Sequence, residues 1–128
     1  MDLSQLRFTK SHEWAKLDGE LCTVGVTDFA VEQLTDVTNL ELPKVGKAVT
    51  AGKPFGEIES VKAVFDLNSP VTGAVAEVND ALRDALTTVT EDPYGKGWML
   101  RIRVPAGSSL DHLMTHDEYK HQIASEGH

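Results

Sequence analysis

Two turn signals enclose the central part of the chain, and they restrict it to folds built from short strands. "PKVG" begins at Pro43 and "PVTG" begins at Pro70. Proline fixes φ and glycine supplies a permissive position, so each stretch favours a reversal of the chain. Between these turns, "PFGEIES" and "AVFDLNS" are both typical of strands, and Lys62 lies between them. The sequence therefore predicts a hairpin with Lys62 at its tip, the most exposed position that a β-domain offers.

The other segments before the C-terminal tail predict further short strands and a few helices. Residues 22–26 predict a strand, and Thr27 or Asp28 can cap a helix over residues 29–34. "DVTNLELPKVG" predicts a strand that stops at Pro43, "VNDALRDAL" a single short helix and "WMLRIRV" a closing strand. We expect a mainly β (α+β) fold in which many short strands close on themselves as a sandwich or flattened barrel, with helices appended.

The end of the chain predicts a helical tail. It runs from Ser108, where Ser109 can cap its first part, and residues 115–118, "THDE", have capping-box spacing for its second part. We therefore divide the chain, as one domain, into a β core over residues 7–107 and a helical tail over residues 108–124. A chain of 128 residues can bury roughly two-thirds of its unfolded surface, so it needs no disulfide or metal to stay folded.

Charge and composition exclude several classes of function. The net charge of −8 argues against non-specific binding to nucleic acid or anionic lipid, and it favours a partner with a basic surface. Cys22 is the single cysteine and is expected to be a small buried hydrophobe. No run approaches the ~18 apolar residues of a membrane-spanning helix. "MDLSQLRFTK" has no targeting character, which indicates a cytoplasmic protein of a bacterial-type cell, or a mitochondrial one if a presequence was removed.

Lys62 is the strongest candidate for a site of covalent attachment. Between Pro54 and Leu82 it is the only basic residue, against five acidic ones: Glu57, Glu59, Asp66, Glu77 and Asp80. A neutral lysine amine is a nucleophile on a long flexible stem, so it can carry an acyl group. Glu57 and Glu59 could mark the site for a modifying enzyme. The residues alone favour the alternative, an ordinary solvated surface lysine.

"SHEW", residues 11–14, is the second candidate site. Ser11, His12 and Glu13 precede the large aromatic side chain of Trp14, which could fix the segment in place. Polar groups held in this way could line a cleft, where Glu13 could accept a hydrogen bond from a cationic guest. Spacing alone favours the alternative, a solvated Glu13.

No catalytic or metal-binding set is visible in the sequence. It has no nucleophile-elbow motif, no phosphate loop and no HExxH. His112 and His116 are four residues apart and could share a face of the predicted tail helix, but two imidazoles do not make a stable site. We therefore expect neither catalysis by this chain nor a bound metal.

Several stretches of the amino-acid sequence resemble those of one known family. "FTKSHEW", "VGVTDFAVEQLTDV", "LELPKVG", "GEIESVKA", "DLNSPVTGAVAEVN" and "EDPYGKGWM" follow in order from about Arg7 to Tyr119. They resemble the H-proteins of the glycine cleavage system, which carry lipoate. Biotin carriers place a methionine on each side of their lysine, whereas this chain has Val61 and Ala63.

The resemblance implies a site, a fold and a set of partners. It makes Lys62 the lipoylated lysine, and it places Ser11, Glu13 and Asp66 along the cleft that shelters the loaded arm. It implies a barrel-sandwich hybrid fold and a non-catalytic carrier. The partners implied are glycine decarboxylase, the aminomethyltransferase, dihydrolipoamide dehydrogenase and a lipoate-attaching enzyme, with no nucleic acid and no membrane. We expect a monomer.

Three departures from the family pattern concern the partners rather than the attachment site. Asn39 stands where the family usually has an apolar or aromatic residue, Phe65 replaces a typically small residue, and residues 84–90 lack the usual Asn-Pro pair. Because Phe65 is close to Lys62, it could alter the mouth of the cleft. The alternatives are a divergent paralogue that donates lipoate to other complexes or serves another lipoyl-dependent pathway, and an unmodified scaffolding domain.

Overall fold

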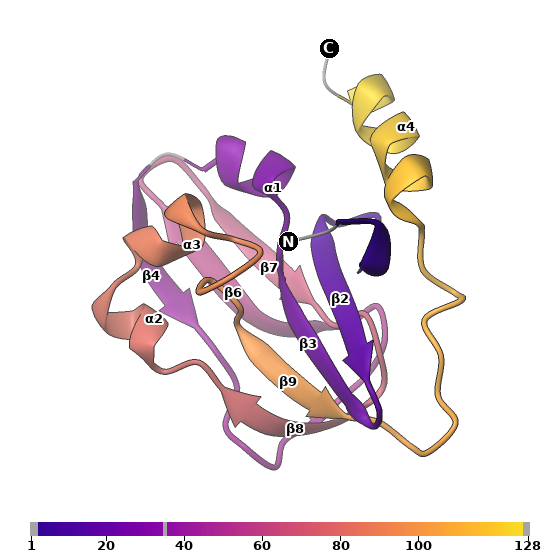
Figure 1. Ribbon diagram of the computed structural model, residues 1–128. Helices are drawn as coiled ribbons and strands as arrows, with labels where there is room; N and C mark the ends of the chain where they lie inside the picture. The colour runs from indigo at the N-terminus through magenta and orange to yellow at the C-terminus, as the bar shows by residue number, and fades with distance from the viewer. Residues whose placement is uncertain (1–2, 35, 127–128) are drawn as a thin grey trace.

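The computed structural model describes residues 3–34 and 36–126, with only the backbone of Glu126, and it contains two antiparallel sheets with short helices around them (Figure 1). In this described part, the larger sheet has the strand order β1-β2-β3-β9-β8-β5 and the smaller one β4-β6-β7. The strands of the larger sheet are β1 (Arg7–Phe8), β2 (Glu13–Asp18), β3 (Leu21–Val26), β9 (Leu100–Arg103), β8 (Gly73–Val78) and β5 (Ala48–Val49). Those of the smaller sheet are β4 (Val37–Glu41), β6 (Pro54–Ser60) and β7 (Val64–Asn68). The predicted mainly β fold is confirmed.

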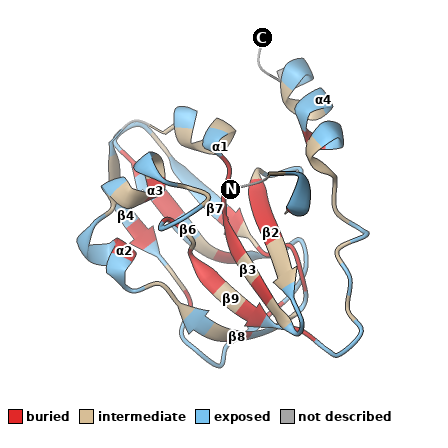
Figure 2. Cartoon of the chain, viewed as in Figure 1, coloured by how far each residue is buried: buried red, intermediate tan, exposed pale blue. Residues whose placement is uncertain are grey.

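The core lies between the sheets, and the pattern of β6 shows how the sequence selects its inner face. Phe55, Ile58 and Ser60 are buried, whereas Glu57 and Glu59 are exposed. The interval between successive buried residues of β6 changes from three positions to two, because the pairing with β7 shifts register between Pro54 and Gly56. Buried segments concentrate on β2, β3 and β9 in Figure 2. Cys22 is fully buried on β3, and burial raises the pKa of its thiol to about 12, so the expected inert hydrophobe is confirmed.

The pairing of β2 with β3 depends on one glycine. Trp14 lies directly opposite Gly25, and a Cβ placed on Gly25 would come within 2.6 Å of the Trp14 indole nitrogen. The absent side chain therefore makes room for the ring. The indole Nε1 donates a hydrogen bond to the carbonyl oxygen of Pro93 at 3.0 Å, which satisfies its only polar group. Trp14 is thus the buried anchor that the "SHEW" segment predicts.

Short helices connect several of the strands. They are α1 (Asp28–Glu32), α2 (Ala81–Asp84) and α3 (Thr87–Glu91), and a 3₁₀ turn, η1 (Leu3–Gln5), precedes β1. Of the two predicted caps of α1, Thr27 is the one used, because its hydroxyl accepts from the Ala30 amide at 3.2 Å. The short helix predicted after Asn79 is confirmed as α2, which ends at Asp84 because Ala85 leaves helical geometry at φ −144. A further helix that was not predicted, α3, follows it and buries Val89.

The C-terminal tail is helical only in its second half. Residues 108–115 are not helical, and only a short turn at residues 111–112 interrupts an otherwise irregular backbone, so the helix predicted from Ser108 with a cap at Ser109 is wrong. Backbone bonds of 2.9 Å in both directions tie Met114 to Phe8 instead, and this pairing draws the segment along β1. The capping box is confirmed at the start of α4 (His116–Glu126). The Thr115 hydroxyl accepts from the Glu118 amide, and Glu118 accepts from the Thr115 amide.

Helix α4 lies outside both sheets and packs against the first residues of the chain (Figure 1). Its Tyr119 is 2% exposed and stacks on Phe8 with ring centroids 4.7 Å apart. These two rings join Leu6 and Trp14 in a small second core. The sequence suggests that His112 and His116 could share a helical face, and this is wrong. His116 is the first residue of α4, whereas His112 lies before the helix.

Candidate functional site

The β6–β7 hairpin presents Lys62 at its tip, as the sequence predicts. Ser60 closes the turn: its amide donates to the Ala63 carbonyl at 2.8 Å, and its hydroxyl bridges the Ala63 amide and carbonyl at 3.3 Å each. The Val61 amide also donates to the carbonyl of Asp36, just before β4. The hydrogen bonds between Ser60 and Ala63, together with the bond from Val61 to Asp36, hold the turn in place and give the lysine a rigid support.

The Lys62 side chain itself is unconstrained. It is exposed, and among residues 3–34 and 36–126 its amine forms neither an ion pair nor a hydrogen bond. Its neighbours Val61 and Val64 are 66% and 55% exposed, so apolar surface surrounds it at the tip. The amine is therefore open to a modifying enzyme.

The outer face of the hairpin carries a row of acidic side chains. Glu41 of β4 lies directly opposite Glu57 of β6, which in turn lies opposite Asp66 of β7. We call these three the carboxylate row. All are exposed, and no described Lys or Arg forms an ion pair with them. Glu59 shares this face but lies between the uncharged Asn39 and Val64. Like charges directly opposed across strands destabilise a sheet, so the row has a cost in folding stability.

Strand β7 also borders a cavity of about 420 Å³, here called the β7 cavity. Most of the surface of its wall is apolar, and the apolar side chains come from β3, α1 and the residues after it, β6 and β7: Val26, Ala30, Leu34, Ile58, Phe65 and Leu67. Phe65 pairs with Ile58 across the hairpin and is 43% exposed, so it lies at the edge of the cavity. The polar part of the lining comes from Lys10, Ser11, His12, Glu13, Gln33, Asp66 and Asn68.

Glu13 is the buried polar group of this cavity. It is 1% exposed, so the solvated position that spacing alone favours is wrong. Its Oε1 accepts hydrogen bonds of 2.5 Å from both the Thr9 and Ser11 hydroxyls, and Oε2 accepts from the Asn68 amide at 3.2 Å. Burial raises the pKa of Glu13, and these donors only partly oppose the effect. The charged form of Glu13 is destabilised by its burial, so a cation that enters the cavity would find a carboxylate that it can stabilise.

Ser11 and Asp66 also line the β7 cavity, in different positions. Ser11 orients Glu13 through its hydroxyl, whereas Asp66 is exposed on β7 and makes no hydrogen bond with a described side chain. Asp66 therefore belongs to the rim of the cavity and Glu13 to its interior. Thr9 and Asn68, which also donate to Glu13, were not expected here; the sequence carries no signal for Asn68, because it reaches Glu13 only through its backbone amide.

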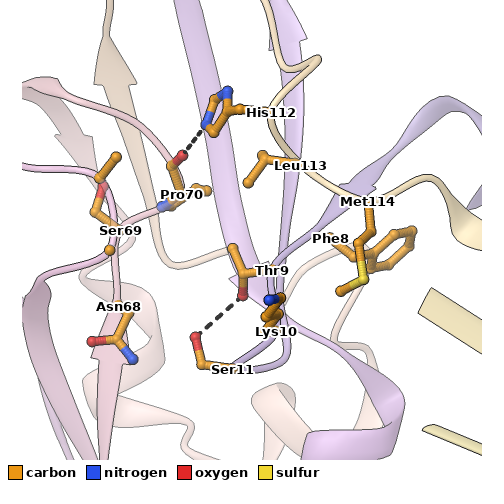
Figure 3. A pocket seen from close by; sticks show the side chains of 12 residues that line it. Phe8, Thr9, Lys10, Ser11, Asn68, Ser69, Pro70, His112, Leu113 and Met114 are labelled. Atoms are coloured by element: carbon orange, nitrogen blue, oxygen red, sulfur yellow. Dashed lines mark hydrogen bonds between the residues drawn. The ribbon is translucent and has the colours of Figure 1, made fainter. Parts of the chain in front are cut away.

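A second hollow of about 550 Å³ lies on the other side of the 9–13 loop. Lys10, Ser11 and Asn68 line both this hollow and the β7 cavity. Figure 3 shows Phe8, Leu113 and Met114 along its wall and the His112 ring directed at the Pro70 carbonyl, 2.8 Å away. His112 is therefore engaged in holding the tail against the turn after β7.

The blocks that suggest a family in the sequence extend over the whole fold. A sequence model described as "Glycine cleavage H-protein" matches residues 6–126. The chain belongs to the glycine cleavage H-protein family. It is similar to the glycine cleavage system H protein of Nostoc punctiforme, with 51% identity over 94% of this chain and 93% of that protein. The identity to the H protein of Rubrobacter xylanophilus is also 51%, over 94% of each chain.

A solved structure of the H-protein family has the same fold. The crystal structure of a glycine cleavage system H protein from Mycobacterium marinum superposes with a TM-score of 0.83 and 34% identity, over 98% of both chains. The expected barrel-sandwich carrier fold is thereby confirmed. Within the described residues, no three His, Cys, Asp or Glu side chains gather as a metal site. None of the described helices is long and apolar enough to cross a membrane.

Proposed function

We propose that this H-protein is a non-catalytic carrier domain with lipoate attached to the amine of Lys62. It would move an aminomethyl group from glycine decarboxylase to the aminomethyltransferase and would be reoxidised by dihydrolipoamide dehydrogenase. One observation carries the proposal: Lys62 is exposed, and its amine has no ion-pair or hydrogen-bond partner among the described residues. It lies in a hydrogen-bonded turn just before β7, the strand that borders a mainly apolar cavity.

The residues present fit a lipoyl arm. Phe65 and Asp66, the first β7 residues to line the cavity, follow Lys62 by only three and four positions. At about 3.4 Å per residue this is about 10–14 Å of strand, a distance that an acylated lysine can fold back along. The cavity wall is mainly apolar, which suits an alkyl chain, and Glu13 supplies one polar group in its interior.

When bound, lipoate supplies a cyclic disulfide whose dihedral is held far from the relaxed ~90°, so it is readily reduced and can accept a carbon fragment. The residues of this chain act on the guest's amine. Glu13 would stabilise its protonated form, and a protonated amine has no free lone pair with which to break the C–S bond that holds the aminomethyl group to the arm. Ser11 and Thr9 hold the carboxylate in place through hydrogen bonds of 2.5 Å.

The exposed acidic groups serve the encounters with other proteins. We assign Glu57 and Glu59 to recognition by the lipoate-attaching enzyme, because they lie beside the tip on the open face of β6. Asp66 at the cavity rim would attract the guest before it reaches Glu13. A tethered arm also raises the effective concentration at each partner to the order of ~1 mM, so weak contacts suffice and the carrier can leave. We place this single-domain carrier in the cytoplasm.

Intact mass spectrometry tests the attachment. After expression with lipoate and a working ligase, the wild-type chain should gain one lipoyl group, and Lys62→Arg should gain none. Lys44→Arg is the matched control, because Lys44 is also an exposed lysine in a turn. An unmodified wild-type chain, or a lipoyl group that persists in Lys62→Arg, would exclude the proposal.

Phe65 favours one alternative within the same class. As a large side chain at the edge of the β7 cavity, it could suit a carrier that donates lipoate to other complexes or serves another lipoyl-dependent pathway. Glycine–bicarbonate exchange with the family's decarboxylase separates the two. Exchange supported by the lipoylated chain indicates the glycine cleavage carrier, whereas lipoylation without exchange indicates the alternative.

A further inference from the structure

The 9–13 loop has an unusual backbone at its centre. His12 adopts φ +72, a left-handed conformation that non-glycine residues rarely occupy. This conformation lies between Ser11 and Glu13, the two residues whose side chains meet inside the cavity. Two backbone bonds support it, from the His12 amide to the Thr9 carbonyl at 3.2 Å and from the Thr27 amide to the His12 carbonyl at 3.0 Å. A strained residue persists only where its surroundings hold it in place.

The His12 side chain supplies more of that support. Its ring lies 4.8 Å from the ring of Phe29 on α1 and 5.7 Å from the ring of Tyr119 on α4. Its Nδ1 is 2.8 Å from the Tyr119 hydroxyl oxygen. The loop is therefore attached to both helices through one imidazole.

The Tyr119 hydroxyl reaches the other wall of the cavity as well. It lies 2.6 Å from the Thr27 hydroxyl, the group that caps α1 by accepting from the Ala30 amide. Ala30 lines the β7 cavity from α1, just as Glu13 lines it from the loop. One hydroxyl group thus connects both walls, and it does so from a helix that itself contributes no lining residue.

Helix α4 is fixed to the same loop at a second point. The Gln122 side-chain amide donates to the Lys10 carbonyl at 3.0 Å, one turn beyond Tyr119. The Tyr119 ring is anchored separately, by its stacking on Phe8. Removing only the hydroxyl should therefore leave the docking of the helix largely intact.

We propose that Tyr119 is a positioning residue for the guest group: through His12 and Thr27 its hydroxyl holds the 9–13 loop and α1 at the separation in which Glu13 receives the amine of the loaded arm. This rests on the proposed function, in which the β7 cavity shelters that arm. A merely structural Tyr119 would affect folding stability without changing the retention of the guest.

Tyr119→Phe tests this, with Tyr94→Phe as the matched control. The Tyr94 hydroxyl donates to Asp28 at 2.7 Å at the same end of α1, but Tyr94 lines no part of the β7 cavity. Both variants should be lipoylated as fully as the wild type. After loading with glycine and decarboxylase, the Tyr119→Phe chain should lose the aminomethyl group about three- to tenfold faster, because it lacks the hydroxyl's hydrogen bonds to His12 and Thr27, while Tyr94→Phe retains it.

Amide hydrogen exchange on the unloaded chain gives an independent measure. Tyr119→Phe should speed the exchange of the His12 and Thr27 amides, whereas Tyr94→Phe should leave them protected. His12→Asn keeps a residue that tolerates positive φ but removes the side-chain bond to Tyr119. Its effect on retention should not add to that of Tyr119→Phe, since both break the same link.

The outcomes separate the two proposals. If the wild type is not lipoylated at Lys62, the proposed function is wrong. If it is lipoylated and loaded but Tyr119→Phe retains the group as long as the wild type does, the positioning role is refuted. If Tyr119→Phe does not fold, His12→Asn decides the question by the same retention measurement.

Discussion

The carboxylate row makes a prediction that runs against intuition, because removing a charge from Glu57 should stabilise the protein. Residues directly opposed across antiparallel strands have Cβ atoms about 5 Å apart. Two carboxylates about 6 Å apart repel by roughly 0.7 kcal/mol in water, and Glu57 has such a neighbour on each side, in Glu41 and Asp66. The total is about 1.4 kcal/mol at low salt, and about half of that at physiological ionic strength, where the Debye length is ~8 Å.

Urea unfolding of Glu57→Gln measures this repulsion. The free energy of unfolding should rise by about 0.7 kcal/mol at 0.15 M salt and by about twice as much at low salt, and the gain should almost vanish near 1 M. Glu59→Gln is the matched control: it is on the same strand and face but faces uncharged Asn39 and Val64, so it should change stability by less than about 0.3 kcal/mol. A Glu57→Gln gain that is absent, equal to that of Glu59→Gln, or independent of salt would refute the reasoning.

Three further predictions concern other parts of the structure. Burial raises the pKa of Glu13 above its usual 4.5, so folding favours the protonated form of this side chain. The free energy of unfolding of the wild type should therefore fall relative to that of Glu13→Gln as the pH rises from about 4 to 7. If urea unfolding gives the same pH dependence for both chains over that range, the prediction is contradicted. Gly25→Ala should push its methyl group against Trp14 and destabilise by about 1–3 kcal/mol, with a shift in tryptophan fluorescence, and an unchanged midpoint of unfolding would count against the packing described. Ser60→Ala should remove two hydrogen bonds in the turn, which lowers the local stability of the tip by about 1 kcal/mol and speeds hydrogen exchange of the Ala63 amide. The free energy of global unfolding should fall by less than this. Unaltered exchange at Ala63 would show that the Ser60 hydroxyl does not stabilise the tip.

Features set by neighbouring residues could be predicted from the sequence. The hairpin tip at Lys62 follows from composition and turn chemistry within a few positions, and so does the capping box between Thr115 and Glu118. The family resemblance named Ser11, Glu13 and Asp66 as cavity residues, and all three line the β7 cavity. In each of these cases, a short stretch of sequence contains the information.

The rest depends on contacts between distant parts of the chain. The buried Glu13 accepts a hydrogen bond from the Asn68 amide, 55 positions away, and His12 meets Tyr119 across 107 positions. The tail after Ser108 does not form the helix that its serines allow, because pairing of Met114 with Phe8 competes with it. Local propensity is a weak prior wherever such tertiary contacts are available.

Strand β7 is the outermost strand of its sheet, so one edge of its backbone pairs with no other strand among the described residues. An open edge of this kind invites a second copy to add its own strand, and charged side chains are a common defence against such aggregation. Two copies joined in register along β7 would bring their Asp66 carboxylates together beside those of Glu57. The repulsion that weakens one hairpin thus also opposes the pairing of two copies along this edge.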